Sequence, residues 1–389
     1  MKYLKHIISL LIIAFLGYSC DAVEDSEQQA EAWQDLELRT EYQDIKVTKV
    51  AGDLERPWAL AFLPDNRMLV TERPGRLNIV ENGNVTVVNG TPEVRAVNQG
   101  GMMEVSVHPN YSENGWIYLT YSQAGPDDET ALTVVRGQLD GADFVQMEEI
   151  FQQNRFSSPG RHYGSKIAWD NEGYMYVSIG DRGANPPRAQ DNSDHAGTLL
   201  RLNDNGTVPD DNPFVGDDDV ANEIFSYGHR NIQGLVINQE NNEIWATEHG
   251  PRGGDELNYI EPGKNYGWPT VSLGRDYRDD REFHNHTEAR QMESMVDPVY
   301  EFLPTLAPSG LALVTTDKFP QWEGNLLAGG LRPERIRRLV IEDYTVIHDE
   351  ELLTFELGRI RDVREGPDGF IYVVTDETPG AIYRIEPND

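Results

Sequence analysis

The stretch Pro367-Asp368-Gly369-Phe370-Ile371-Tyr372-Val373-Val374 places turn residues directly before a run of aromatic and β-branched residues. This order is typical of a strand that begins at a tight turn. The theme occurs five more times, in residues 64–71, 114–121, 170–177, 241–246 and 323–328. Recurring strand units without a long amphipathic helical pattern predict an all-β, six-bladed β-propeller over residues 43–389, with insertions between strands. A β-sandwich or a two-domain β protein is the alternative.

The composition of the 389 residues excludes several classes of protein. Hydrophobic residues make up 38% and charged residues 25%, with 35 Gly and 22 Pro scattered along the chain, which argues against collagen, coiled coils and wholesale disorder. The formal net charge of −33 disfavours binding of nucleic acid or anionic lipid over the general surface. Of the 33 basic residues, 26 are Arg, which makes directional contacts with carboxylates and phosphates. An anionic ligand is therefore expected only in a local, Arg-lined pocket.

The first 19 residues are predicted to be a signal peptide. Two lysines precede an apolar run from Ile7 to Leu16, which is about half of the ~20 residues needed to span a bilayer. Cys20, the only cysteine, lies where cleavage is expected, and the segment resembles a bacterial lipoprotein signal in which that cysteine is lipidated. We expect an exported bacterial lipoprotein, in the periplasm or at the outer membrane or cell surface, anchored only by lipid, with residues 20–42 as an acidic tether. Plain secretion with an incidental cysteine is the alternative.

His162 is the candidate general base. It lies in a Gly-flanked loop, and an imidazole has an ordinary pKa of about 6.5, which suits proton abstraction near neutral pH. Asp181 follows one hairpin later and is placed to orient the imidazole and to stabilise its cation. A surface or turn histidine and a turn-capping aspartate are the alternatives.

Two later loops carry further candidates. Arg230 and Asn231 place a permanent cation and an amide side by side at a strand end, where the cation would polarise a carbonyl. The loop around Gly250 and Pro251 combines exposed backbone carbonyls with carboxylates, which are hard oxygen ligands that suit calcium, although the spacing is not that of an EF-hand. A surface salt bridge and a long polar loop are the respective alternatives.

The last third of the chain is rich in arginine. Arg359 and Arg361 project on the same face of a predicted strand, and Arg332 lies in a second Arg-rich stretch. Two neighbouring guanidinium groups repel each other unless an anion lies between them. We therefore favour a small anionic ligand over ion pairing with the chain's own acids.

Taken together, these segments resemble the soluble pyrroloquinoline quinone (PQQ)-dependent sugar dehydrogenases, which include glucose/sorbosone and aldose sugar dehydrogenases. The motifs that carry the resemblance lie in order along most of the chain. They are residues 56–62, 71–76, 99–102, 227–235, 248–258, 265–269 and 359–363.

The resemblance implies a six-bladed propeller and a role for each candidate. His162 would take the proton of the sugar hydroxyl during hydride transfer to PQQ, with Asp181 holding the imidazole and Arg230 neutralising charge on the quinone oxygen. Further residues would bind the cofactor, namely Gln99, Asn231, Arg332, Arg359 and Arg361. Calcium would be held by the carbonyl oxygens of Gly250 and Pro251 together with cofactor atoms, and electrons would leave to an external acceptor.

The chain departs from the family pattern at two places. Leu303 stands where glucose-oxidising members carry an aromatic residue over the cofactor, which leaves the range of sugars open. Residues 272–276 are only loosely similar to the loop that binds a second calcium in those members. Two other functions compete with sugar oxidation: a calcium-dependent sugar-lactone hydrolase and a carbohydrate-binding propeller without catalysis.

Overall fold

Each of the six turn-and-strand units of the sequence becomes the second strand of one antiparallel sheet. The computed structural model describes residues 33–183, 186–283 and 294–388. Most residues of these second strands are buried, because the sheets of neighbouring blades cover both faces of each strand. This explains why the strands read as continuous apolar runs instead of alternating patterns. The second strands are β4 (Met68–Glu72), β8 (Ile117–Ala124), β12 (Met175–Ile179), β16 (Ile244–Glu248), β20 (Leu326–Leu331) and β24 (Ile371–Thr375).

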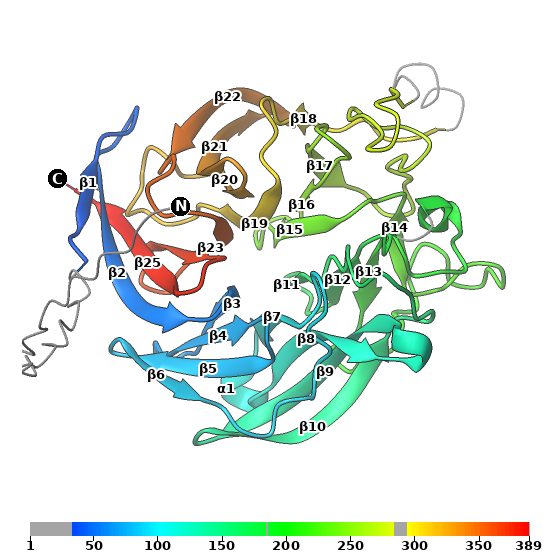
Figure 1. The fold of residues 1–389 in the computed structure, drawn as a ribbon, viewed down its shortest axis with the longest axis horizontal. Coiled ribbons are helices and arrows are strands. Elements are labelled where there is room, and N and C mark those ends of the chain that lie inside the picture. Colours follow the sequence, from blue (N-terminus) through cyan, green and yellow to red (C-terminus); the bar gives the residue numbers. More distant parts are fainter. Residues whose placement is uncertain (1–32, 184–185, 284–293, 389) are drawn as a thin grey trace, which may run out of the picture. The chain divides into compact units, whose positions relative to one another are not determined.

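The sheets follow one another around a ring, and the prediction of six blades is confirmed (Figure 1). The first strand of every blade lies innermost, next to the first strand of its neighbours. These inner strands are β3 (Pro57–Phe62), β7 (Met102–Val107), β11 (Ile167–Trp169), β15 (Ile232–Ile237), β19 (Pro308–Leu313) and β23 (Ile360–Glu365). The third strands are β5 (Arg76–Glu81), β9 (Thr130–Asp140), β13 (Thr198–Leu202), β17 (Glu256–Ile260) and β21 (Glu334–Glu342). The outer strands are β6 (Asn84–Val87), β10 (Asp143–Gln152), β14 (Ile224–Tyr227), β18 (Tyr300–Glu301) and β22 (Thr345–Leu352).

Blade 6 joins the two ends of the ring. Its third strand is β25 (Gly380–Pro387), and β2 (Ile45–Leu54) pairs with β25 in antiparallel register from Ile45 opposite Pro387 to Leu54 opposite Gly380. Strand β1 (Leu36–Leu38) adds to the outside of β2. Strands from opposite ends of the sequence therefore share one sheet and close the ring.

The junction between blades 6 and 1 shows how the ring is held by apolar packing. Leu60 and Val70 of blade 1 pack with Tyr372, Val374 and Ile382 of blade 6, and all five are buried. Because such contacts join strands that are distant in sequence, the ring positions loops from all six blades relative to one another.

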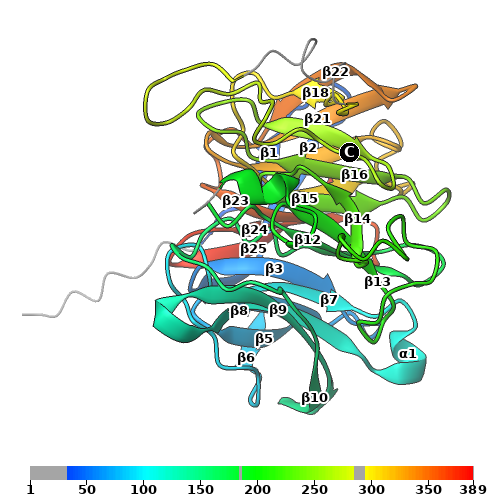
Figure 2. The same cartoon turned by 90° about the vertical axis from the view of Figure 1, so that its right-hand side faces the viewer.

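The ring has two faces with different loops. In an antiparallel blade, the turns between strands one and two and between strands three and four lie on one face, and the remaining connections lie on the other. The short helix α1 (Tyr111–Asn114) joins β7 to β8 on the first face and lies at the right of Figure 2. The second face carries the connections in which the sequence places the candidate residues, and we call it the mouth. The short 3₁₀ segments η1 (Pro126–Asp128) and η2 (Pro186–Gln190) lie in two of its connections.

Only part of the N-terminal segment for which the sequence analysis raised expectations is described by the structure, from residue 33 onward. Cys20 and the signal peptide lie outside them. The tether was expected to reach residue 42, whereas β1 already pairs with β2, since a three-residue strand is too short to show a pattern in the sequence. Within the described ranges, we find no helix with the length and apolarity that a membrane-spanning helix needs.

Candidate active site

Loops from five blades meet around a cavity of ≈ 250 Å³ at the mouth, which we call the inner cavity. It contains most of the polar candidates that the sequence analysis singled out. Its lining consists of Arg56, Trp58, Arg73, Gln99, His162, Arg230, Asn231, Gln233, His249, Gly250, Tyr277, Leu331, Arg359, Arg361 and Asp376.

His162 and Asp181 form a tight pair. The Nδ1 atom of His162 lies 2.6 Å from Oδ1 of Asp181. The same carboxylate accepts hydrogen bonds from the Trp268 indole N–H at 2.8 Å and from the Gly183 backbone N–H at 2.7 Å. The lowered pKa of Asp181 keeps this carboxylate ionised, so Nδ1 of His162 carries the proton of the pair and Nε2 keeps a free lone pair.

The surroundings of the pair keep the imidazole neutral. Burial lowers the pKa of His162; the hydrogen bond to Asp181 opposes this effect and the positive charge of Arg230 adds to it, so that the pKa lies below its ordinary value. Burial, the largest single influence, raises the pKa of Asp181, but the hydrogen bond and charge of His162, the charge of Arg230 and the Gly183 N–H together lower it below its ordinary value. A neutral imidazole next to a carboxylate is the protonation state that a general base requires at neutral pH.

The backbone of His162 is held in an uncommon conformation. Its φ angle is 51°, in the left-handed region that non-glycine residues rarely adopt. The Gln99 side-chain oxygen accepts the His162 backbone N–H at 2.8 Å, and the Asn231 side-chain oxygen accepts the Gly164 N–H at 3.0 Å. Gln99 and Asn231, both expected to contact the cofactor or substrate, thus line the cavity and also fix the loop that carries the imidazole.

Arg230 is held by a buried carboxylate beneath it. Glu248 accepts the Arg230 backbone N–H at 2.7 Å, lies 3.0 Å from Nδ1 of His229 and accepts an Asn258 amide N–H at 2.9 Å. The guanidinium group of Arg230 donates to the His249 carbonyl at 3.2 Å and lies 5.4 Å from the Trp268 ring centroid. The side chain of Arg230 therefore lies beside the pair formed by His162 and Asp181.

A second group of cations converges on a single carboxylate. Asp376 is buried and accepts hydrogen bonds from Arg361 at 2.6 Å and from Arg359 at 3.1 Å, and Arg56 lies 3.7 Å away. Burial and the neighbouring guanidinium groups lower the pKa of Arg73, although Asp376 opposes them. Within the described chain, the Arg73 guanidinium has neither an ion pair nor a hydrogen bond. Three cations thus share one carboxylate and Arg73 adds a fourth positive charge to the same cavity, and this excess of positive charge suits an anionic ligand.

The positions of the predicted arginines differ from one another. Arg359 and Arg361 both line the inner cavity, although β23 begins only at Ile360, so that Arg359 lies in the connection just before the strand. Arg332 does not, because it is at the tip of the hairpin between β20 and β21, where its side chain is exposed. Among the lining residues that the role assignment overlooked are Arg56 and Arg73, although both lie in the quoted family segments.

The loop expected to hold calcium offers carbonyl groups but few free carboxylates. Asp255 accepts the backbone N–H of Gly250 at 2.9 Å and of Leu306 and Ala307 at 2.9 and 2.7 Å, so it ties this loop to blade 5. The Pro251 carbonyl accepts the Arg275 N–H at 3.0 Å, which leaves it one lone pair. Over the described residues, no group of three or more His, Cys, Asp and Glu side chains could hold a metal ion. Calcium here would need oxygen ligands from a bound cofactor in addition to the two carbonyls.

A larger cavity of ≈ 770 Å³ lies next to the inner one, and we call it the outer cavity. The two cavities share Gln99, His162, Arg230 and Tyr277. The outer cavity is lined by these four residues and by Arg161, Asp181, Gly183, Pro251, Trp268, Pro269, Asp276, Arg278, Arg281 and Phe283. Leu303, expected over the cofactor, is exposed and lines neither cavity, whereas Tyr277 supplies an aromatic ring to both. His162 and Arg230 thus stand where two ligands could meet.

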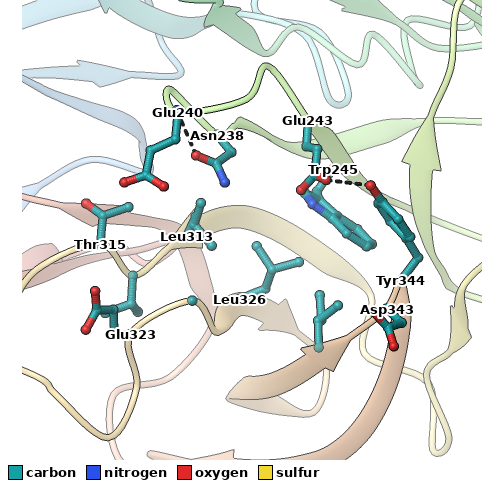
Figure 3. Close-up of a pocket in the computed structure, with 13 residues that line it drawn as sticks. Asn238, Glu240, Glu243, Trp245, Leu313, Thr315, Glu323, Leu326, Asp343 and Tyr344 are labelled. Atoms are coloured by element: carbon teal, nitrogen blue, oxygen red, sulfur yellow. Dashed lines mark hydrogen bonds between the residues drawn. The ribbon is translucent and has the colours of Figure 1, made fainter.

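A third cavity, of ≈ 400 Å³, lies between blades 4 and 5 on the face opposite the mouth (Figure 3). Within this cavity, Glu243 lies next to Trp245 in Figure 3, and the Tyr344 hydroxyl donates to Glu243 at 2.7 Å. None of the described residues that line it is basic. An anionic ligand therefore fits the mouth and not this cavity.

Comparison with known proteins agrees with this geometry. The family model of the glucose/sorbosone dehydrogenases matches residues 54–384. The chain belongs to the glucose/sorbosone dehydrogenase family. This is a family of sugar-oxidising oxidoreductases, and the matched residues include every strand of the ring except β1, part of β2 and the end of β25.

Relatives of this glucose/sorbosone dehydrogenase family member cover nearly the same span. The aldose sugar dehydrogenase YliI of Escherichia coli is 37% identical over 350 residues, which is 89% of this chain and 94% of the relative. The crystal structure of the soluble aldose sugar dehydrogenase of E. coli in its apo form superimposes with a TM-score of 0.84 at 38% identity, over 88% of this chain and all of that one. The PQQ-bound aldose sugar dehydrogenase of Streptomyces coelicolor gives 0.73 at 27% identity, over 88% of this chain and 98% of that one.

Proposed function

We propose that this protein oxidises aldoses at the anomeric hydroxyl with PQQ as its resident cofactor. The observation that carries the proposal is the shared wall of the two cavities, where His162 and Arg230 lie between a cation-lined inner cavity and an open outer one. PQQ is a planar tricarboxylate, which fits a cavity in which Arg56, Arg73 and Arg359 lie with Arg361 around one carboxylate. When bound, PQQ supplies the quinone carbonyl that accepts the hydride from the anomeric carbon.

The chain's own residues would carry the proton and the charge. His162 takes the hydroxyl proton at Nε2 while the sugar carbon loses its hydride, so the alcohol C–O bond becomes the C=O of a lactone. Asp181 keeps the Nδ1 proton in place and stabilises the imidazolium. Arg230 stabilises the negative charge that develops in the inner cavity, and the carbonyls of Gly250 and Pro251 would hold calcium with cofactor oxygens. An external acceptor then takes up the two electrons.

The two competing functions find less support in these contacts. A lactone hydrolase with a protein-bound calcium needs several free carboxylates at the mouth, whereas Asp181, Glu248 and Asp255 are each used by protein donors. A binding module has no use for a neutral imidazole oriented by an ionised carboxylate.

The test is reconstitution of the purified chain. We expect added PQQ and calcium together to give reduction of an artificial electron acceptor by aldoses, with little activity when either is omitted. Calorimetric titration should show uptake of PQQ by itself. Absence of PQQ binding, or lactone hydrolysis without the quinone, would contradict the proposal.

We also propose that the protein is exported and lipidated at Cys20, which supports a location in the periplasm or at the cell surface. The support comes from the N-terminal sequence alone. Labelling of cells with a palmitate analogue should mark the protein, and Cys20→Ala should abolish the label. Labelling that survives the substitution would contradict the anchor.

A further inference from the structure

We propose that the outer cavity selects aldoses that carry an oxyanion, a carboxylate or a phosphate, away from the anomeric carbon. The inference rests on the proposed function and adds the class of sugar. Uronic acids and sugar phosphates are the two sources of this chemistry.

The first argument is the charge of the lining. Four guanidinium groups face two carboxylates in the outer cavity, although the chain as a whole has a net charge of −33. Of the carboxylates, Asp181 is taken up by His162 and Trp268. Asp276 is shared by Arg278 at 3.0 Å and Arg281 at 3.5 Å. Among the lining residues of this loop, one carboxylate thus lies between two guanidinium groups, which leaves one positive charge unbalanced within the lining; Asp279 next to Arg278 does not line the cavity.

The second argument is the position of the cations relative to the base. Arg161 directly precedes His162 and donates one hydrogen bond to the Gly183 carbonyl at 2.7 Å, which leaves other N–H groups for a ligand. Arg278 and Arg281 belong to a different loop of the same cavity, and both are largely exposed. When the anomeric hydroxyl of a sugar lies at Nε2 of His162, the other substituents of the sugar ring would therefore lie in the same cavity as these guanidinium groups and could bind to them.

The third argument is the apolar part of the same wall. The rings of Trp268 and Phe283 lie 5.4 Å apart between centroids, and Tyr277 adds a third ring. Aromatic rings bind the C–H faces of a sugar ring, while guanidinium groups bind carboxylate or phosphate in a directional way. The cavity on the opposite face has aromatic rings and carboxylates but no basic residue among its described lining, so it lacks the positive lining of the outer cavity.

The experiment compares kcat/KM of the reconstituted holoenzyme for D-glucuronate and D-glucose 6-phosphate with that for D-glucose. We expect at least one anionic sugar to exceed glucose. The double variant Arg278→Gln/Arg281→Gln should lower the anionic-to-neutral ratio by about tenfold, the lower end for a charge-assisted contact. Arg278→Lys/Arg281→Lys keeps the charge and should retain most of the ratio. Arg67→Gln is the matched control, since Arg67 pairs with Asp65 at 2.9 Å in the β3–β4 turn, away from the mouth.

Calorimetric titration of the quinone-free protein with glucose and with each anionic sugar gives a readout that does not need turnover. Preference for glucuronate alone assigns a carboxylate, and preference for glucose 6-phosphate alone assigns a phosphate. Glucose oxidation at equal or higher kcat/KM than both anions, with a ratio unchanged in the glutamine variant, overturns the inference and leaves the proposed function standing. Tighter binding of an anionic sugar by a protein that oxidises no aldose supports the cavity assignment and overturns the proposed function.

Discussion

If the Nε2 lone pair of His162 acts as the general base, this residue contributes to the chemical step and not to binding of the cofactor. Its Nδ1 is occupied by Asp181 at 2.6 Å, which leaves one nitrogen for the substrate. We predict that His162→Ala lowers kcat by roughly 10²–10⁴-fold, as expected for loss of a general base. PQQ affinity, measured by calorimetry, should stay within about threefold. His348→Ala removes an imidazole from β22, outside both mouth cavities, and is the control; a PQQ affinity that falls as far as kcat would contradict the role.

The pH dependence of the rate follows from the direction of the His162 pKa. The imidazole acts when unprotonated, and burial together with Arg230 places its pKa below the ordinary value. Activity should therefore be full at neutral pH and be lost as pH falls through a midpoint below about 6.5. Arg230→Gln removes a charge that lowers this pKa, so the midpoint in kcat/KM should move to higher pH, along with a lower rate. A midpoint that moves to lower pH in Arg230→Gln would exclude the assignment.

Substitutions of Arg359 and Arg332 test which of these two arginines belongs to the cofactor site. Arg359 contacts Asp376 at 3.1 Å and lines the inner cavity, whereas Arg332 is exposed at a hairpin tip. We predict that Arg359→Ala weakens PQQ binding about tenfold, near 1.4 kcal/mol, because its contact is partly exposed to water. Arg332→Ala should change PQQ affinity by less than about twofold. An equal loss of PQQ affinity in the two variants would contradict this prediction and indicate that Arg332 also binds the cofactor.

At the scale of elements, the loop between β14 and β15 depends on a carboxylate in β16. One carboxylate oxygen of Glu248 accepts the Arg230 backbone N–H, and the other accepts an Asn258 amide N–H. A glutamine at this position has only one oxygen, so it can accept only one of these two bonds in the same geometry. We predict that Glu248→Gln costs about 1–3 kcal/mol of unfolding free energy, because a buried donor loses its acceptor. It should also lower kcat without moving the pH midpoint set by His162. Glu240→Gln, in an exposed turn of the same blade, is the control, and a Glu248→Gln protein with unchanged stability and rate would contradict the loop's dependence.

The elements that the sequence analysis predicted are those whose signal is local. Each turn before a second strand carries its own Pro, Asp, Asn or Gly, so the six blades could be counted from short stretches. The pair His162 and Asp181 could be proposed because one hairpin separates them. The approach of Arg56 to Asp376 could not, because these residues lie in blades 1 and 6 and meet only after β2 pairs with β25. The exposure of Arg332 likewise follows from its place at the tip of the β20–β21 hairpin, whereas Arg359 lies in the connection from blade 5 to blade 6 and lines the cavity.

At the scale of the whole molecule, a buried ion network joins the inner strands of four blades. Lys166 next to β11 lies 2.9 Å from Glu104 of β7 and 2.8 Å from Asp362 of β23, and Arg364 pairs with both carboxylates. Asp362 also accepts the backbone N–H of Leu60 in β3 at 3.1 Å. The Lys166 ammonium lies 4.7 Å from the ring centroid of Trp58, which lines the inner cavity. Two cations and two anions therefore balance in the centre of the ring, directly connected to a wall of the candidate site.

This balance predicts the outcome of a substitution series. Lys166→Met removes one of the two cations of this network, so that Arg364 alone faces the two buried carboxylates Glu104 and Asp362. This uncompensated negative charge should lower the free energy of unfolding by about 3–5 kcal/mol in denaturant titrations. Lys166→Met/Glu104→Leu leaves Arg364 paired with Asp362 at 2.9 Å, so the double variant should be more stable than the single one. Lys46→Met, which breaks an exposed pair with Asp35, is the control and should leave the free energy of unfolding nearly unchanged. If the double variant is instead less stable than Lys166→Met, the central network stabilises the ring by the shape of its side chains and not by the balance of its charges.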